Sequence, residues 1–250
     1  GGTHIINVKT ISGNTTINGG DQSDTINVGS NAAGVLGDAA NNTNGTLDDI
    51  GALLSISGND PTSGSDVLNV DDTGDSVGRT RTLTATTISG QGMDGSIKYD
   101  TVETLNISLG SGRDTFNVYG TFSSTETTIT TDPADPGSLG TIGNTINVGN
   151  PGRTLNDIAG RLVLLGSSQY DVVNVDDSAD DVPNTGELSA SQLLGLGMGS
   201  ADQTAVNYAE GIEYRGLEEL NIWLGTNDDN FTVLDTDGHN SALPNLFGGA

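Results

Sequence analysis

The sequence predicts an all-β protein, and specifically a β-solenoid of the β-helix or β-roll type that is built from degenerate repeats. Three observations favour this fold. Short segments alternate apolar and polar residues, glycine-rich corners with a carboxylate join them, and the combined pattern recurs along the chain. Alternation with a period of two is typical of a half-buried strand. A tandem of β-sandwiches, one for each long sequence copy, is the alternative, because the corners are irregularly spaced.

The clearest repeating unit is LNISLGSGRDTFNV, which covers Leu105–Val118. Leu105, Ile107 and Leu109 would share one side of an extended chain, while the polar residues between them face the other side. Two glycines then allow a sharp corner that carries Asp114. The second run alternates again. The unit therefore predicts a strand, an acidic corner and a second strand.

This unit recurs at two levels. LNIWLGTNDDNFTV at 220–233 matches it 115 residues later, and DVLNVDD at 66–72 returns as DVVNVDD at 171–177, which is 105 residues later. Self-similarity of this kind is a signature of repeat architecture. We expect two copies in one elongated body: 1–140 with lead-in strands, and 141–250 with an irregular tail.

The second half of the unit occurs six times along the chain. The copies are DTINV at 24–28, DVLNV at 66–70, DTFNV at 114–118, NTINV at 144–148, DVVNV at 171–175 and DNFTV at 229–233. Stacking would place one apolar residue of each copy in a single interior ladder, namely Ile26, Leu68, Phe116, Ile146, Val173 and Phe231. The residues that follow would form an outward amide ladder, broken at Thr232, of Asn27, Asn69, Asn117, Asn147 and Asn174.

The remaining segments fit the same scheme in chain order. Residues 3–28 hold two or three short strands, and the threonine-rich segment 79–91 alternates as a strand does. TLDDIGALL at 46–54 and TLNDIAGRLVLL at 154–165 are the nearest to amphipathic helices, but each runs directly into a strand. We therefore expect a short turn or a strand approach at both. The last ten residues show no regular period.

Composition limits the partners of the chain. The formal charge is −25, from 33 acidic and 8 basic residues, and the basic residues are scattered. Nucleic acid and anionic membranes are therefore excluded as partners, and divalent cations are favoured. No stretch approaches the roughly 18 apolar residues of a membrane helix, so we expect no membrane insertion. The absence of cysteine and a glycine at position 1 fit a mature piece or excised region of an extracellular bacterial protein.

The corners resemble the glycine- and aspartate-rich nonapeptide G-G-x-G-x-D-x-U-x of RTX, or hemolysin-type, calcium-binding proteins. GGDQSDTIN at Gly19–Asn27 and LGSGRDTFN at Leu109–Asn117 match it best, while LGTNDDNFT at Leu224–Thr232 and the segment Thr62–Asn69 match more loosely. The resemblance implies a secreted bacterial protein such as a large adhesin, toxin or surface layer. It also implies calcium at the corner aspartates Asp24, Asp66, Asp114, Asp171 and Asp229.

Clustered carboxylates add further candidate calcium ligands, because calcium favours carboxylate and carbonyl oxygens. Solvated acidic turns are the alternative for each cluster. The candidates are Asp21 in the first corner, Asp71, Asp72 and Asp75, then Asp176, Asp177 and Asp180, and finally Asp235 and Asp237 in the last loop.

The sequence therefore predicts an extracellular structural module, stabilised by calcium, that serves as an adhesin spacer or as the subunit of a surface fibre or layer. Like subunits or flanking repeats would be its partners, end to end, and a surface polysaccharide is a further partner that the sequence leaves open. The alternative is a carbohydrate-active β-helix, either a polysaccharide lyase or a glycoside hydrolase. A hydrolase needs only two facing carboxylates, but no nucleophile elbow or phosphate loop is present and we expect no enzyme. A groove with paired carboxylates would favour the enzyme, and acids confined to turns would favour the scaffold.

Overall fold

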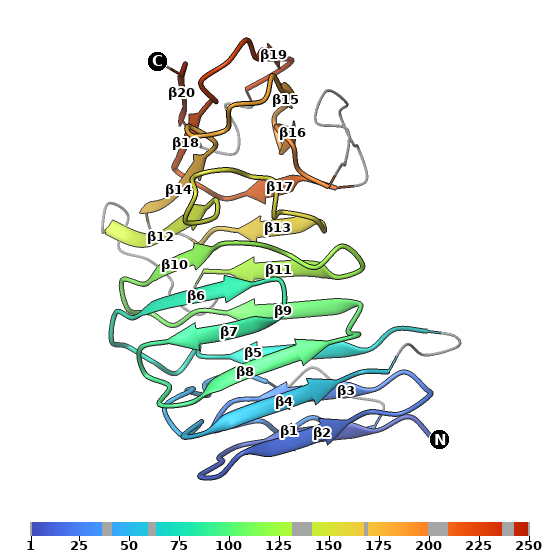
Figure 1. The fold of residues 1–250 in the computed structure, drawn as a ribbon. Helices are drawn as coiled ribbons and strands as arrows, with labels where there is room; N and C mark the ends of the chain where they lie inside the picture. The colour runs from blue at the N-terminus through green and yellow to red at the C-terminus, as the bar shows by residue number, and fades with distance from the viewer. Residues whose placement is uncertain are drawn as a thin grey trace.

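A computed structural model of the chain describes residues 2–36, 42–59, 64–131, 142–167, 170–199, 210–236 and 243–249. Within these residues the protein is all-β, as the sequence predicts, and contains strands but no helix (Figure 1). Consistent with this, the described part of the chain has no helix that could cross a membrane. The strands form two ten-stranded sheets.

One sheet begins with β1 and the other with β2, and in each sheet the strands pair one after another from one edge to the other. The first sheet comprises β1 (Ile5–Val8), β3 (Thr25–Val28), β5 (Val67–Asp71), β9 (Thr104–Ser108), β11 (Glu126–Thr130), β13 (Leu162–Leu165), β17 (Ile212–Arg215), β16 (Gln192–Gly195), β15 (Thr185–Leu188) and β19 (Asn230–Val233). The second sheet comprises β2 (Thr15–Asn18), β4 (Leu53–Ser57), β8 (Ser96–Asp100), β7 (Thr87–Gly90), β6 (Thr80–Thr84), β10 (Thr115–Val118), β12 (Ile142–Val148), β14 (Tyr170–Asp176), β18 (Glu219–Trp223) and β20 (Leu243–Phe247).

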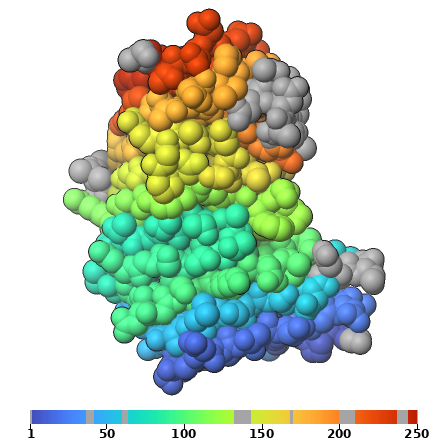
Figure 2. Space-filling view, in the orientation of Figure 1, coloured from blue at the N-terminus to red at the C-terminus, as the bar shows by residue number. Residues whose placement is uncertain are grey.

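Most connections carry the chain from one sheet to the other, so successive strands of one sheet come from successive passes of the chain. These neighbours pair in parallel and in register; for example, Ile26 of β3 lies opposite Leu68 of β5, which lies opposite Leu105 of β9. Figure 1 shows the passes rising from the N-terminal strands to the C-terminal strands, and Figure 2 shows the same order as successive layers on the surface. The sequence repeat is therefore also a spatial repeat.

Each sheet contains one antiparallel meander of three strands. In the second sheet β6, β7 and β8 pair antiparallel, and in the first sheet β15, β16 and β17 do so. The first two strands of each meander correspond in sequence at the 105-residue offset, and the third strands, β8 and β17, correspond at an offset of 115. Their equivalent turns contain Gly92 and Gly197, with φ angles of 78° and 77°, which a residue with a Cβ rarely adopts. The sequence predicts a single alternating strand over 79–91, but the structure divides it into the antiparallel strands β6 and β7, and alternation does not indicate β16.

The two long sequence copies are placed in opposite sheets. DVLNVDD includes β5 of the first sheet, whereas its repeat DVVNVDD lies in and just after β14 of the second sheet. The pairs β9 and β18, and β10 and β19, are exchanged in the same way. One copy is thus related to the next by a half-turn about the stack as well as a shift along it.

The core lies between the sheets and is built from their inward apolar side chains. In the first sheet Ile26, Leu68 and Leu105 are fully buried and adjacent, and in the second sheet Phe116 and Ile146 are equally buried. The single interior ladder expected from the sequence is therefore wrong. Because the chain alternates between sheets, the six repeated strands divide into two ladders that face each other.

Phe231 does not extend the ladder that contains Phe116. It lies in the first sheet opposite Gly186 of β15 and is only partly buried, although it packs against the core. Its position near the end of the stack leaves it with fewer neighbouring strands.

Outward asparagine side chains form two hydrogen-bonded ladders, where the sequence predicts one. After the first asparagine of each ladder, each Nδ2 donates to the Oδ1 of the asparagine in the preceding strand of the sheet at 2.8–3.0 Å. The first sheet carries Asn7, Asn27, Asn69 and Asn106, and the second sheet carries Asn117, Asn147, Asn174, Asn221 and Asn245. Stacked amides at strand spacing thus stabilise both faces.

The two segments that most resemble helices are turns that lead into strands, as predicted. The N–H of Ile50 donates to the carbonyl of Leu47 at 3.0 Å, and the N–H of Ile158 donates to that of Leu155 at 2.9 Å. All four side chains are buried. Each turn therefore fills the core at the corner before β4 or β13.

Candidate metal sites

The corner carboxylates accept hydrogen bonds from the backbone of the neighbouring corner. The N–H of Asp24 donates to Oδ1 of Asp66 at 2.7 Å, and the N–H of Asn144 donates to Oδ1 of Asp171 at 2.8 Å. Asn144 takes the same part with its amide oxygen, which accepts from the N–H of Asp114 at 2.9 Å. These side chains are buried. They continue the pairing of the strands around the corner, where no backbone carbonyl is in place.

Glycines that precede the corner aspartates make room for these carboxylates. A Cβ at Gly19 would lie 2.7 Å from Oδ2 of Asp24, and a Cβ at Gly58 would lie 2.5 Å from Oδ2 of Asp66. Both distances are far below van der Waals contact. Glycine before the corner aspartate therefore has a packing reason that holds without an ion, and calcium at these corners remains a prediction.

The first residue of each aspartate pair closes its own loop. Oδ1 of Asp71 accepts from the Oγ1 and N–H of Thr73, at 2.6 and 3.1 Å. Oδ1 of Asp176 accepts from Ser178 in the same way, and its Oδ2 accepts from Nε of Arg153 at 2.9 Å. Burial opposes ionisation of Asp176, but these hydrogen bonds outweigh it and lower its pKa.

Three further predicted ligands are neither corner aspartates nor members of the aspartate clusters after the strands. Asp21 and Asp235 are exposed, and Asp237 lies outside the described residues. Within the described ranges no group of three histidine, aspartate or glutamate side chains has metal-coordinating geometry. The carboxylates of any candidate site would therefore have to move closer together to hold an ion.

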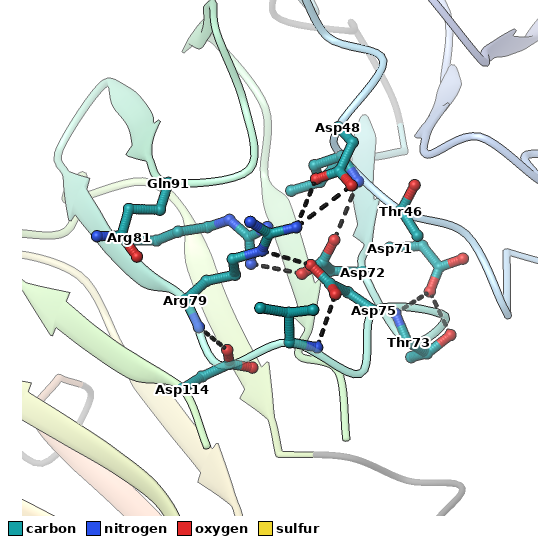
Figure 3. Close-up of polar contacts among 12 residues, drawn as sticks. Thr46, Asp48, Asp71, Asp72, Thr73, Asp75, Arg79, Arg81, Gln91 and Asp114 are labelled. Carbon is teal, nitrogen blue, oxygen red and sulfur yellow. Dashed lines mark hydrogen bonds and ion pairs between the residues drawn. The ribbon is translucent and has the colours of Figure 1, made fainter. Parts of the chain in front are cut away.

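The first acidic cluster consists of Asp72, Asp75 and Asp114, and two arginines neutralise part of its charge (Figure 3). Asp72 and Asp75 follow β5, Asp114 is the corner before β10, and the arginines come from the start of β6. Arg81 is 2% exposed, and its Nη1 contacts Oδ2 of Asp72. Nε of Arg79 lies 2.7 Å from Oδ2 of Asp75. The cluster is thus a buried ion-pair network.

Burial raises the carboxyl pKa values in this cluster. The pKa of Asp72 rises to about 6, because desolvation outweighs the attraction of Arg81. Burial also raises the pKa of Asp114, although the backbone N–H of Arg79 and the charge of Arg81 oppose it. The arginines therefore compensate the buried carboxylates only in part.

The second acidic cluster consists of Asp177, Asp180 and Asp229, which are the sequence equivalents of the first. In both clusters each Oδ1 accepts a backbone N–H from an equivalent residue. The distances in the first cluster are 2.9 Å from Leu47, 2.8 Å from Val77 and 2.7 Å from Arg79. Those in the second are 3.0 Å from Leu155, 2.9 Å from Val182 and 2.9 Å from Asn184.

The second cluster has no arginine in the equivalent positions. Asn184 replaces Arg79 and Gly186 replaces Arg81 at the 105-residue offset. Burial raises the pKa of Asp177 to about 8, and the charges of Asp180 and Asp229 add to this rise. Identical backbone contacts therefore hold two clusters whose charge balance differs.

Sequence reasoning misses several residues that complete these corners. Glu103 and Glu218 accept the N–H groups of Asp66 and Asp171 at 2.5 and 2.7 Å, so the acceptor there is a glutamate just before the next strand of the sheet, β9 or β18. The buried Arg81 counts, in the sequence, only as one of the scattered cations. Aligning the two copies residue by residue would reveal that Arg81 corresponds to a glycine in its repeat.

One surface groove of about 610 Å³ lies beside the turns of the middle passes. Its lining includes the aromatic residues Tyr119 and Phe122 and a single carboxylate, Asp157. Asp157 accepts a hydrogen bond from Nδ2 of Asn150 at 2.7 Å. The groove therefore offers aromatic faces without a second facing carboxylate.

Comparison with known proteins finds no family model, no curated protein and no solved structure that matches this chain.

Proposed function

We propose that the chain is a structural repeat module of a secreted bacterial protein, which serves as an adhesin spacer or as the subunit of a surface fibre or layer. In this proposal the two sheets are the faces of a flattened β-solenoid, and partners stack on its ends. The observation that carries the proposal is that both sheets have open edges at both ends of the stack, with matching strand directions.

The edges are β1 and β2 at one end and β19 and β20 at the other. Each meander reverses direction twice, so β19 runs parallel to β1 and β20 runs parallel to β2. A second copy could therefore continue both sheets at once with parallel pairs. Such a head-to-tail contact does not close on itself and generates a linear assembly.

The placement of the acids supports a scaffold. The buried aspartates lie at corners and strand ends, where they accept backbone hydrogen bonds from neighbouring passes. This role stabilises the stack directly. Extracellular location is part of the proposal and is consistent with a cysteine-free chain of charge −25.

A carbohydrate-active role is the second candidate, and the groove beside Tyr119 and Phe122 is the observation in its favour. Aromatic faces are suited to sugar rings, but glycoside hydrolysis uses two carboxylates and this groove contains only Asp157. The groove therefore supports binding of a surface polysaccharide better than its cleavage.

The stacking proposal is tested by assembly of the purified chain. The N–H groups of Asn230 and Leu234 donate to the carbonyls of Asn184 and Leu188 on the β15 side. Because N–H groups alternate in direction along a strand, the N–H of Val233 points to the open edge. Val233→Pro removes this donor, and Val233→Thr keeps it. We expect concentration-dependent linear assemblies for the parent and Val233→Thr, and weaker assembly for Val233→Pro, by sedimentation velocity and electron microscopy. A parent chain that stays monomeric at high concentration would reject self-assembly.

A further inference from the structure

The comparison of the two acidic clusters shows which oxygens are left without a partner. In the first cluster the Oδ2 atoms of Asp72 and Asp75 meet the guanidinium groups of Arg81 and Arg79. In the second cluster the same backbone N–H contacts fix the carboxylates in the same orientation. Their Oδ2 atoms are therefore directed to the place that is equivalent to the position of the two guanidinium groups in the first cluster, which Figure 3 shows.

These oxygens are buried. Asp177 is fully buried, and Asp180 and Asn184 are 2% exposed. Within the described residues, the Oδ2 atoms of Asp177, Asp180 and Asp229 and the Oδ1 of Asn184 have no hydrogen-bond partner. A buried carboxylate without a counter-charge costs several kcal/mol, so a cation or a proton must compensate this cluster.

We propose that the second acidic cluster binds one Ca²⁺ ion, which takes the place of the Arg81 guanidinium in the first cluster. The ligands are the unpartnered oxygens of Asp177, Asp180, Asp229 and Asn184, which must move closer together to close on the ion, because the three carboxylates are not in coordinating geometry without it. Calcium accepts six to eight oxygen ligands in flexible geometry, so carbonyl oxygens or waters complete the shell. Magnesium demands a stricter octahedral arrangement and suits this mixed set less well.

The packing around Gly186 leaves no room for a side chain in this role. A Cβ at Gly186 would lie 2.7 Å from Cδ2 of Phe231, so a side chain at this position would meet the aromatic ring. Asp229 is only partly buried as a residue, and the turn that follows Gly225 is exposed. A small ion can therefore enter from this turn.

The test is a titration of the metal-free full chain with CaCl₂ by calorimetry, together with thermal melting. We expect one site with a Kd on the order of 10⁻⁴ to 10⁻³ M, which is typical of extracellular modules. At a hundredfold excess over Kd, Tm should rise by about 5–10 °C. Asp177→Asn should lose this site and the shift. Asp229→Asn, at a partly exposed position, carries the same test if Asp177→Asn does not fold.

Asp72→Asn is the matched control in the first cluster. It keeps the acceptor for Leu47 but removes the charge that contacts Arg81, so Tm should fall equally with and without calcium, and calcium binding should persist. No binding and an unchanged Tm for the parent would overturn the proposal and leave the proton as the compensating cation. Parent-like binding by a folded Asp177→Asn or Asp229→Asn would also overturn it. The inference goes beyond the stacking function, and assembly is measured separately, so either can fail alone.

Discussion

Asp171 shows how much one corner carboxylate contributes to this fold. Its Oδ1 accepts from the N–H of Asn144, and its Oδ2 accepts from Oγ1 of Thr131 at 2.7 Å and from the N–H and Oγ of Ser167 at 2.8 and 3.1 Å. The side chain thus closes its own loop and joins it to two segments that lie 27 and 40 residues away in sequence. The resemblance to calcium-binding corners locates this residue but does not reveal these contacts.

Asp171→Ala should lower the free energy of unfolding by about 3 kcal/mol or more, because it leaves several buried donors without an acceptor. Urea unfolding followed by circular dichroism measures the change. Asp235→Ala, at an exposed position, should stay within about 0.5 kcal/mol of the parent. Equal effects at the two positions would show that the corner contacts contribute little.

The pH dependence of stability should report on Asp177. Its pKa is about 8 in the folded chain against an ordinary value of 3.8, so between these values the folded chain holds a proton that the unfolded chain has released. The free energy of unfolding from this group therefore falls as pH rises from about 4 to 8 and is level above. In calcium-free buffer, Tm should decrease from about pH 5.5 to about pH 8, and Asp177→Asn should flatten this slope. An unchanged slope in the variant would contradict the assignment.

At the scale of elements, sequence alternation predicts most of the strands but not their distribution between sheets. The repeated strands β3, β5, β10, β12, β14 and β19 all lie where the six motif copies place them. Whether two copies share a sheet depends on how many passes separate them, and the two meanders alter that count. β7 and β16 have only four residues each and pair with neighbours on both sides, so no local pattern marks them as separate strands.

The candidate site was predictable to the same degree. The aspartate pairs and the corner aspartates could be located from the motif, and the structure brings Asp177, Asp180 and Asp229 into one cluster. The decisive difference between the clusters, Arg81 against Gly186, stands at the 105-residue offset and would appear in a residue-by-residue alignment of the two copies. That Arg81 is buried and is the counter-charge of Asp72 is visible only in the structure.

Phe116 and Phe231 occupy equivalent motif positions and should respond differently to truncation. Phe116 is 1% exposed between two strands of the second sheet, so Phe116→Ala should cost about 3–5 kcal/mol of unfolding free energy. Phe231→Ala should cost clearly less, because β19 is an edge strand and the ring is only partly buried. Urea unfolding of both variants gives the comparison, and equal losses would contradict the placement of Phe231 in the first sheet.

At the scale of the whole molecule, a stack with open edges combines pairing capacity with strong repulsion. Each chain carries a formal charge of −25, and the proposed end-to-end contact between chains brings these charges together. Strand pairing favours assembly and charge repulsion opposes it, so we expect assembly to depend on the ionic strength of the solution. The exposed Val233 and Leu234 at the C-terminal end add apolar surface that a stacked copy would cover.

Assembly should therefore increase with ionic strength. Screening shortens from about 30 Å at 0.01 M salt to about 8 Å at 0.15 M, which weakens repulsion between stacked copies more than it weakens their hydrogen bonds. Sedimentation velocity in calcium-free buffer at the two salt concentrations measures this. Assembly that is stronger at low salt would indicate attraction between charges at the ends.

The half-turn between the two sequence copies has a consequence for any longer array of such units. A feature that occurs once in each copy, such as the acidic cluster, points to opposite sides in consecutive copies and returns to the same side in every second one. A fibre built this way would display its contacts along two opposite flanks, and could bridge two surfaces that face each other.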